Sequence, residues 1–492
     1  MAADPSGFFD RFRAALNAAD PIPALRAGLV GKGACVEGAF GPRPLVYADH
    51  TASGRALMQI ERAILEEVLP YYANSHTEAS FCGAHMTALR RAARAEVARA
   101  CGAGDEHSVV FCGAGATAGL NRLVHLLGLP AAAASAVPPL VILGPYEHHS
   151  NILPWRESGA EIKTLPEAPG GGPDLAALDA ALEQAGAGRL VVGAFSAASN
   201  VTGHLTDVAE VTRRLKRTGA LAVWDYAGGG PYLPIAMDPA PDAPIDALVI
   251  SPHKFAGGPG ASGVMILRRD AARLSRPVWP GGGTVRFVSP EAHDYAASIE
   301  AREEAGTPNI LGDIRAALTF VVKHAVGVER IAARHAALRQ RALAAWSAEP
   351  RLSILGNPRG ERLPVFALRI SDAGSGVVHP QLVTRLLSDL HGIQARGGCA
   401  CAGPYVHGLL QIDAATSQRI RQGILDGDEI GKPGFTRLNL GFLLSDVEAQ
   451  TIIDGVCDIA RRASTLSEAY AADASTAIFH PRRAAAAVTL QP

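Results

Sequence analysis

The sequence Ala-Leu-Val-Ile-Ser-Pro-His-Lys-Phe occupies residues 247–255 of this 492-residue chain. Its first four residues form a short apolar run of the kind that makes a buried β-strand, and Lys254 follows that run. Lysine is rare here, since six of the 46 Lys and Arg residues are lysine. Burial keeps a lysine amine in its neutral, nucleophilic form, which Schiff-base chemistry on a carbonyl group requires. The segment predicts either such a reactive lysine or a surface lysine just past a strand end.

The composition is that of an ordinary globular protein, with 48% hydrophobic residues and a net charge of −1 at pH 7. That charge balance indicates neither a nucleic-acid partner nor a charged membrane surface. We find no apolar stretch long enough to cross a bilayer and no secretory leader pattern, so we expect a cytoplasmic protein. The seven cysteines are odd in number, which favours reduced thiols over a disulfide framework.

Short β-branched runs alternate with helical patterns from Val46 onward, which predicts an α/β fold with a mostly parallel sheet covered on both faces. In such sheets ligands bind beyond the carboxyl ends of the strands. The predicted strands are 108–112, 140–143, 161–165, 190–195, 221–224, 247–250 and 263–267, and the predicted helices include 55–69, 86–101 and 208–217.

The domain organisation that we expect has four parts. A long helical pattern from about residue 312 to residue 345 carries the chain out of a large domain and toward a smaller α/β domain. The end of the chain is rich in Ala with Pro and Arg, which favours a loosely held segment. The expected parts are a helical segment at 1–45, a large cofactor-binding domain at 46–325, a small C-terminal domain at 326–468 and a flexible tail at 469–492.

The stretch Phe-Cys-Gly-Ala-Gly-Ala-Thr-Ala-Gly-Leu-Asn (111–121) reads as a strand end, a Gly-rich turn and the start of a helix. A helix N-terminus entered through small residues offers free N–H groups and a positive dipole end to an anion, and Thr117 can add a hydroxyl. The spacing fits neither a P-loop nor a dinucleotide fingerprint. Taken alone, the stretch is also compatible with a turn that binds nothing.

Two further motifs follow predicted strands. In Pro-Tyr-Glu-His-His-Ser-Asn-Ile-Leu-Pro-Trp (145–155), His148 can lie against an aromatic ligand and act as an acid or base near neutral pH. Adjacent histidines also suggest a metal, but no matching cysteine or carboxylate cluster is near, so we expect none. Asp225 ends the strand Leu-Ala-Val-Trp-Asp (221–225), where it can either keep a heterocyclic nitrogen protonated or simply cap the next turn.

Together these motifs supply what pyridoxal 5′-phosphate (PLP) needs: an anion site, a stacking imidazole, a partner for the pyridine nitrogen and an amine for the aldehyde. We therefore expect PLP as the cofactor. The order along the chain is the Gly-rich turn with Thr117, then His148, Asn200, Asp225, Ser251, His253 and Lys254.

From about Val46 to Arg462 the sequence resembles the class V PLP-dependent aminotransferase family, and in particular its cysteine desulfurase-like group. The resemblance implies PLP-dependent transferase fold type I, similar to aspartate aminotransferase, and a homodimer with active sites at the subunit interface. It is carried by Glu-His-His-Ser-Asn-Ile-Leu-Pro-Trp (147–155), Ser-Asn-Val-Thr-Gly (199–203), Ser-Pro-His-Lys (251–254) and Glu-Ala-Gly-Thr-Pro-Asn (304–309).

The resemblance also implies a role for each matching residue in cofactor binding. Lys254 would hold the cofactor aldehyde, His148 would stack on the ring, and Asp225 would pair with the ring nitrogen. Asn200 would lie near the ring hydroxyl or the substrate carboxylate. The phosphate would be bound by Thr117, Ser251 and His253, and by Thr307 of the neighbouring subunit.

In the second domain, Ala-Arg-Gly-Gly-Cys-Ala-Cys-Ala-Gly-Pro (395–404) resembles the desulfurase segment in which an arginine precedes the nucleophilic cysteine by five residues. That spacing selects Arg396 and Cys401. Thr-Arg-Leu-Asn-Leu-Gly (436–441) resembles the segment whose arginine holds the substrate α-carboxylate, a task that suits the planar guanidinium of Arg437. Cys399 is close enough in sequence to form a strained disulfide with Cys401, bind a metal with it or share a persulfide.

The chain departs from the family pattern at three points. Gly228 stands where a glutamine is usual, Ala116 where a second threonine is common, and about thirty residues separate the cysteine segment from Arg437. We expect a desulfurase that moves sulfur from L-cysteine to Cys401, with alanine as product and possible transfer to an acceptor protein. The alternatives are a PLP-dependent C–S lyase, epimerase or aminotransferase without a cysteine nucleophile, and a non-catalytic protein that keeps the fold.

Overall fold

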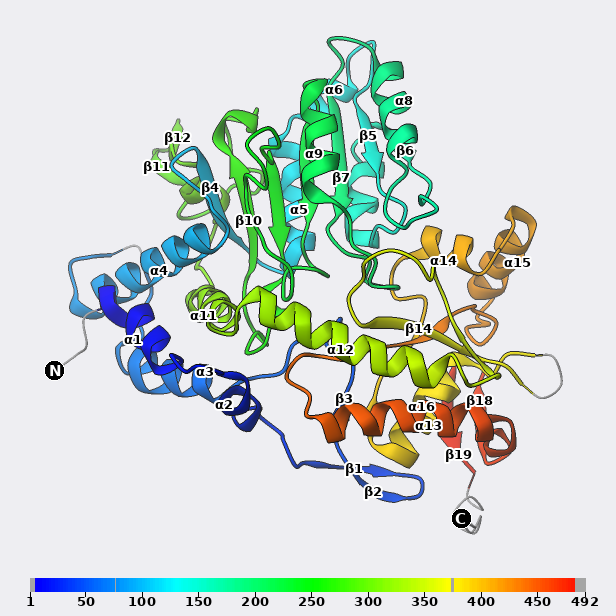
Figure 1. The fold of residues 1–492 in the computed structure, drawn as a ribbon. Coiled ribbons are helices and arrows are strands. Elements are labelled where there is room, and N and C mark those ends of the chain that lie inside the picture. Colours follow the sequence, from blue (N-terminus) through cyan, green and yellow to red (C-terminus); the bar gives the residue numbers. More distant parts are fainter. Residues whose placement is uncertain (1–4, 76, 373–375, 483–492) are drawn as a thin grey trace. The chain divides into compact units, whose positions relative to one another are not determined.

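The computed structural model describes residues 5–75, 77–372 and 376–482 (Figure 1). The chain divides into two compact units, which are described separately here. The first unit contains Met1–Val30, Ser53–Ser199 and Leu205–Ile331, and the second contains Gly31–Ala52, Asn200–His204 and Ala332–Pro492. Two short segments, 31–52 and 200–204, thus belong to the same unit as the C-terminal part of the chain.

The first unit is built on a seven-stranded sheet whose strand order is β4-β10-β9-β8-β7-β5-β6. Strands β9, β8, β7, β5 and β6 run parallel, whereas β10 is antiparallel to both of its neighbours. This confirms the mostly parallel sheet expected from the sequence. The strands are β4 (His107–Cys112), β5 (Leu140–Leu143), β6 (Glu161–Thr164), β7 (Val191–Ser196), β8 (Leu221–Asp225), β9 (Ala247–Ile250) and β10 (Gly263–Arg268).

Helices accompany this sheet, and several of them begin at a residue whose side chain caps the helix. Helix α9 begins after Asp207, whose side chain accepts a hydrogen bond from Glu210 N, and basic residues occupy its last turn. The helices of the first unit are α1 (Phe8–Ala15), α2 (Ile22–Ala27), α3 (Met58–Ala63), α4 (Phe81–Ala100), α5 (Gly115–Leu126), α6 (Leu129–Ala133), α7 (Leu153–Arg156), α8 (Leu175–Ala185), α9 (Val208–Arg217), α10 (Ile299–Glu303) and α11 (Ile310–Val326).

Two expected helices differ from their predicted form. The helix expected over 55–69 is a short α3 followed by a π-type turn (Ile64–Val68) and a 3₁₀ turn (Leu69–Tyr71) that contains Pro70. The long pattern at 312–345 is two helices, α11 and α12 (Val328–Trp346), because Gly327 adopts a positive φ of 84° between them.

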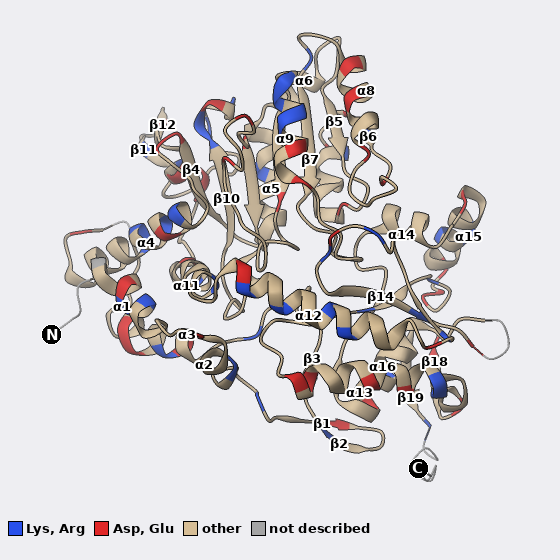
Figure 2. Cartoon of the chain, in the orientation of Figure 1, with Lys and Arg blue, Asp and Glu red and all other residues tan. Residues whose placement is uncertain are grey.

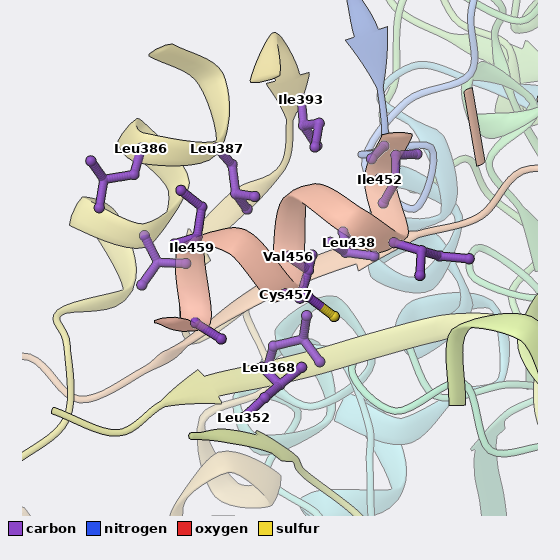
Figure 3. Packing of buried hydrophobic residues seen from close by; sticks show 14 of the residues in the cluster. Leu352, Leu368, Leu386, Leu387, Ile393, Leu438, Ile452, Val456, Cys457 and Ile459 are labelled. Carbon is purple, nitrogen blue, oxygen red and sulfur yellow. The ribbon is translucent and has the colours of Figure 1, made fainter. Parts of the chain in front are cut away.

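The second unit has a four-stranded antiparallel sheet of order β13-β14-β17-β16 and a short parallel pair, β3 with β15. Apolar side chains of α13 and α16 pack with those of β14 and β17 in its core (Figure 3). Its strands are β3 (Val46–Tyr47), β13 (Leu352–Ile354), β14 (Val365–Ile370), β15 (Ile393–Gln394), β16 (Arg396–Gly398) and β17 (Phe435–Asn439), and its helices after α12 are α13 (Pro380–His391), α14 (Gly403–Leu409), α15 (Ala414–Leu425) and α16 (Asp446–Ser467).

Both ends of the chain hold hairpins that the composition does not predict. The segment expected to be helical at 1–45 also contains the hairpin β1 (Cys35–Gly38) with β2 (Gly41–Pro44). The tail expected to be flexible from residue 469 instead forms the hairpin β18 (Tyr470–Asp473) with β19 (Ile478–Pro481). Tyr470 is buried and donates a 2.7 Å hydrogen bond to Asp389 Oδ2, which ties this hairpin to α13. The last part of the expected tail, 483–492, lies outside the described residues.

A third hairpin, β11 (Val285–Val288) with β12 (His293–Tyr295), follows β10 in the first unit.

Figure 2 shows Lys and Arg interspersed with Asp and Glu along the helices, whereas the strands are mostly uncharged. Among the helices that the structure describes, none combines the length and the apolar character needed to cross a membrane.

Candidate active site

Lys254 lies directly after the carboxyl end of β9, in a single 3₁₀ turn (Pro252–Lys254), and is partly buried. Pro252 opens the turn, and Lys254 N donates a 3.0 Å hydrogen bond to Ser251 O. Gly54 packs against this turn, because its N–H donates to His253 O at 2.9 Å. A Cβ on Gly54 would stand 1.8 Å from Phe255 O, so only glycine allows this close approach.

Asp225 ends the neighbouring strand β8, in register with Val249 of β9. Its side chain is buried, and burial raises the pKa of its carboxyl group. The N–H of Ala227, which donates to Oδ1 at 2.7 Å, and the charge of Lys254 act on that pKa in the opposite direction. The structure thus brings Lys254 and Asp225 into electrostatic contact at the carboxyl end of the sheet.

Four polar groups gather at the N-terminus of α5. Ser251 Oγ accepts a 3.0 Å hydrogen bond from Ala116 N, and Thr117 Oγ1 lies 2.7 Å from Ser150 Oγ. Gly115 has a φ of 58°, and a Cβ there would meet both Ser251 Oγ and His253 Cε1 at 2.8 Å. The side chains of Ser251 and His253, which are expected to bind phosphate, therefore lie very close to the backbone of Gly115. Burial and the charge of Lys254 lower the pKa of His253 to about 4, so its imidazole is neutral at pH 7.

His148 is held in one tautomer by a local hydrogen bond. Its Nδ1 accepts a 3.1 Å bond from Ser150 N and caps the short turn His149–Asn151. A nitrogen that accepts carries no proton, so the neutral ring bears its proton on Nε2. Ser150 links His148 to the α5 cluster, because its hydroxyl also meets Thr117.

Glu147, next to His148, was not singled out from the sequence. Its carboxyl group is buried and accepts hydrogen bonds from Ser196 N (2.8 Å), Ser196 Oγ (2.6 Å) and Asn151 Nδ2 (2.6 Å). Burial, against those hydrogen bonds, raises its pKa to about 7, and the charge of Asp225 adds to the rise. Glu147 therefore joins the segment carrying His148 to the end of β7, where Ser196 is in register with Asp225.

In the second unit, Arg396 and Arg437 face each other as cross-strand partners on β16 and β17. Asp49, which was also missed, lies between them: Oδ2 accepts from Arg396 Nε and Oδ1 from Arg437 Nη2, both at 2.9 Å. Burial lowers the pKa of Arg437, and the carboxylate of Asp49 opposes that change. The sequence signal for Asp49 is weak, since it is one aspartate after a two-residue strand.

The loop that carries Cys399 and Cys401 lies close to Arg437. Asn200 Nδ2 donates to Ala400 O at 2.8 Å, and Arg437 Nη1 donates to Asn200 O at 3.3 Å. Ala400 and Cys401 have φ values of 50° and 53°, a left-handed conformation that non-glycine residues adopt at an energetic cost. Cys401 is exposed, Cys399 is half-buried, and both are free thiols. The charge of Cys401 also raises the pKa of Arg437, so the two groups are close enough to interact.

Thr307 is a predicted site residue of the first unit, but among the residues that the structure describes it is not hydrogen-bonded to the other predicted site residues there. It lies exposed in the loop between α10 and α11. Within the described part of the chain, no hydrogen bond connects it to the residues at the N-terminus of α5. The structure thus groups the remaining candidates as Thr117, His148, Asp225, Ser251, His253 and Lys254 in the first unit, and Asn200, Arg396, Cys401 and Arg437 in the second.

Comparisons with known proteins identify the family of this chain. The family model of aminotransferase class-V matches residues 46–423. A cysteine desulfurase of Pectobacterium atrosepticum is 31% identical over 371 residues, which cover 74% of this chain and 85% of the relative. A probable cysteine desulfurase of Streptomyces coelicolor is 26% identical over 424 residues, covering 84% of this chain and 91% of the relative.

Solved structures of similar fold include two cysteine desulfurases. One, from Thermococcus onnurineus NA1, has a TM-score of 0.68 and 24% identity, and the alignment covers 85% of this chain and 95% of that one. The other, CsdA from Escherichia coli, has a TM-score of 0.68 and 22% identity, with coverage of 90% and 98%. At this level of identity these neighbours establish the fold, which is PLP-dependent transferase fold type I.

Proposed function

Since the chain belongs to the aminotransferase class-V family, we propose that it is a PLP-dependent cysteine desulfurase that moves sulfur from L-cysteine to Cys401 and forms alanine. The observation that carries the proposal is the cluster of Arg396, Arg437 and the Cys401 loop within the second unit. Two guanidinium groups suit an amino-acid carboxylate, and a thiol beside them suits the substrate sulfur.

The residues of the first unit fit PLP. The absence of a Cβ at Gly115 lets Ser251 and His253 lie close to the α5 N-terminus, where Thr117 adds a hydroxyl, and this arrangement suits a phosphate. Asp225 is a buried carboxylate suited to a protonated ring nitrogen, and Lys254 supplies the amine that would hold the aldehyde. When bound, PLP supplies an electron sink for charge that develops on the substrate.

The remaining steps belong to the protein's own side chains. Arg437 and Arg396 bind the substrate carboxylate, while Lys254 and the Nε2–H of His148 move protons. The Cys401 thiolate attacks the substrate sulfur: a bond forms between Cys401 Sγ and that sulfur, and the carbon–sulfur bond breaks. The electron pair stays on the substrate carbon, whose protonation gives alanine.

Steady-state turnover of two cysteine variants tests this reaction. With L-cysteine and a thiol reductant, Cys401→Ser is expected to lose at least about a hundredfold in alanine and sulfide formation, the lower range for loss of a nucleophile. Cys399→Ser, two residues away on the same loop, is the matched control and should keep most of the activity. A Cys401→Ser enzyme with full turnover would contradict the proposal.

A second candidate keeps PLP but uses no cysteine nucleophile, as in a C–S lyase, epimerase or aminotransferase. Gly228 after Asp225 and the helices α14 and α15 between Cys401 and Arg437 favour it, because both are departures from the family pattern. It predicts that pyruvate and sulfide, or another amino-acid product, form at the same rate when both Cys399 and Cys401 are replaced by serine.

A further inference from the structure

Asp49 is held rigidly at the end of β3. The preceding residue, Ala48, donates to Gln394 O at 3.0 Å and accepts from Asn439 N at 2.8 Å, so its peptide is bound to both β15 and β17. Asp49 O itself accepts from Ala52 N at 3.0 Å. The backbone therefore fixes where the carboxylate of Asp49 can reach.

The carboxylate spans two arginines of unequal exposure. The side chains of Asp49 and Arg437 are 9% and 5% exposed, whereas that of Arg396 is 55% exposed. Apart from Cys401, whose charge also acts on Arg437, the two guanidinium groups and the carboxylate of Asp49 together carry a net charge of +1. Because the side chains of Asp49 and Arg437 are shielded from water, their charges are weakly screened and act strongly on a nearby anion.

Two buried polar atoms of the cluster have no hydrogen-bond partner among the described residues: Arg437 Nε and Asn200 Oδ1. Both residues are less than a tenth exposed. Buried polar groups are normally hydrogen-bonded, so an unmatched donor and an unmatched acceptor on two residues that are hydrogen-bonded to each other indicate a place for a polar ligand. The α-carboxylate and α-amino group of an amino acid supply an acceptor and a donor.

We propose that Asp49 is a specificity-determining residue that sets the charge of this site to +1, so that it takes an amino acid with one carboxylate and an uncharged side chain. Asp49 neutralises one of the two positive charges, so no unpaired positive charge remains here for a second anionic group on the substrate. This inference rests on the proposed function only in taking Arg396 and Arg437 as the carboxylate-binding pair.

The test compares the affinities of the protein for two tetrahedral anions of different charge, the dianion sulfate and the monoanion methanesulfonate. Each anion is titrated near neutral pH into the protein as purified. Asp49→Asn is expected to raise sulfate affinity about tenfold or more, as an extra unit charge in a shielded site does, and to change methanesulfonate affinity less. Asp49→Asn combined with Arg396→Gln restores the net charge of +1 and should return the ratio of the two affinities toward that of the wild type.

Asp446→Asn is the matched control, because Asp446 also bridges two arginines, Arg334 and Arg341, but is 71% exposed. It should leave the ratio unchanged. If Asp49→Asn does not fold, Arg396→Gln alone reduces the net charge to zero and should weaken methanesulfonate binding about tenfold.

A folded Asp49→Asn protein with the wild-type ratio, or Arg396→Gln with wild-type methanesulfonate affinity, would overturn the inference. Neither measurement requires turnover of cysteine, so loss of the proposed desulfurase activity is recognised separately. In the active enzyme, Asp49→Asn should also shift the ratio of kcat/KM values for L-cysteine and L-cysteine sulfinate toward the sulfinate, which carries the additional anionic group.

Discussion

Glu147 and Asp49 are both buried acidic residues next to candidate site residues, but their surroundings differ. Asp49 lies between two guanidinium groups, whereas Glu147 accepts hydrogen bonds from the uncharged Ser196 and Asn151. Without a cation, burial dominates and raises the pKa of Glu147 to about 7. With a pKa of about 7, Glu147 is protonated in about half of the molecules at neutral pH, which reduces the negative charge beside Asp225.

This pKa predicts how stability depends on pH. A carboxyl group with a raised pKa in the folded state stabilises the fold below its unfolded value of 4.5 and loses that contribution as pH rises to about 7. The stability of the wild type relative to Glu147→Gln should therefore fall between those pH values, by roughly 3 kcal/mol. Denaturant unfolding at several pH values measures it. Glu157→Gln, exposed on the same segment, should show no such trend, and a flat Glu147→Gln difference would refute the assignment.

Lys254, Asp225 and the α5 turn share a feature: each lies at or just after the end of a strand, whereas Arg396 and Arg437 lie within strands. Lys254, Asp225 and the α5 turn were predictable because buried apolar runs mark the strand ends that precede them. Glu147 and Asp49 were not, because their roles depend on Ser196, Arg396 and Arg437, which are distant in sequence. Nothing in the local sequence distinguishes them from surface carboxylates.

At the scale of elements, α5 depends on the glycine at its first position. Gly115 combines a left-handed φ with two side chains 2.8 Å from where a Cβ would stand. Gly115→Ala is expected to weaken PLP binding about tenfold or more, because Ser251 and His253 must move, and to cost about 1–2 kcal/mol for the backbone conformation. The affinity for pyridoxal, which lacks the phosphate, should change much less.

Gly219→Ala is the matched control, since Gly219 also has a positive φ, of 77°, but nothing lies within 4 Å of its Cβ position. It should lose stability by a similar backbone term and keep PLP affinity. Equal losses of PLP and pyridoxal affinity in Gly115→Ala would contradict the phosphate site at α5.

The strands that could be predicted from the sequence were mostly those with continuous runs of buried apolar residues. All seven strands of the large sheet lie within two residues of their predicted ends, because continuous apolar runs are a strong signal. The hairpin of β18 and β19 was missed because its stretch is rich in Ala and polar residues. Its order comes from the burial of Tyr470 against α13 and from the strand ladder, which composition does not report.

At the scale of the whole molecule, the exposed position of Thr307 is consistent with a role in a second subunit. We expect a homodimer, with a mass in solution near twice the chain mass of 51.1 kDa by light scattering. Because Thr307 would complete the partner's phosphate site, Thr307→Ala should weaken PLP binding by about 0.5–1.5 kcal/mol, the worth of one hydrogen bond, without dissociating the dimer. A monomer with full PLP affinity would contradict this expectation.

The central claim is that Cys401 accepts the sulfur of L-cysteine. The most direct measurement is peptide mass spectrometry after one turnover of the purified enzyme with L-cysteine, followed by alkylation. The account predicts one additional sulfur atom on the peptide at Cys401, and none at that position in Cys401→Ser. Alanine formation without any added sulfur on Cys401 would contradict it.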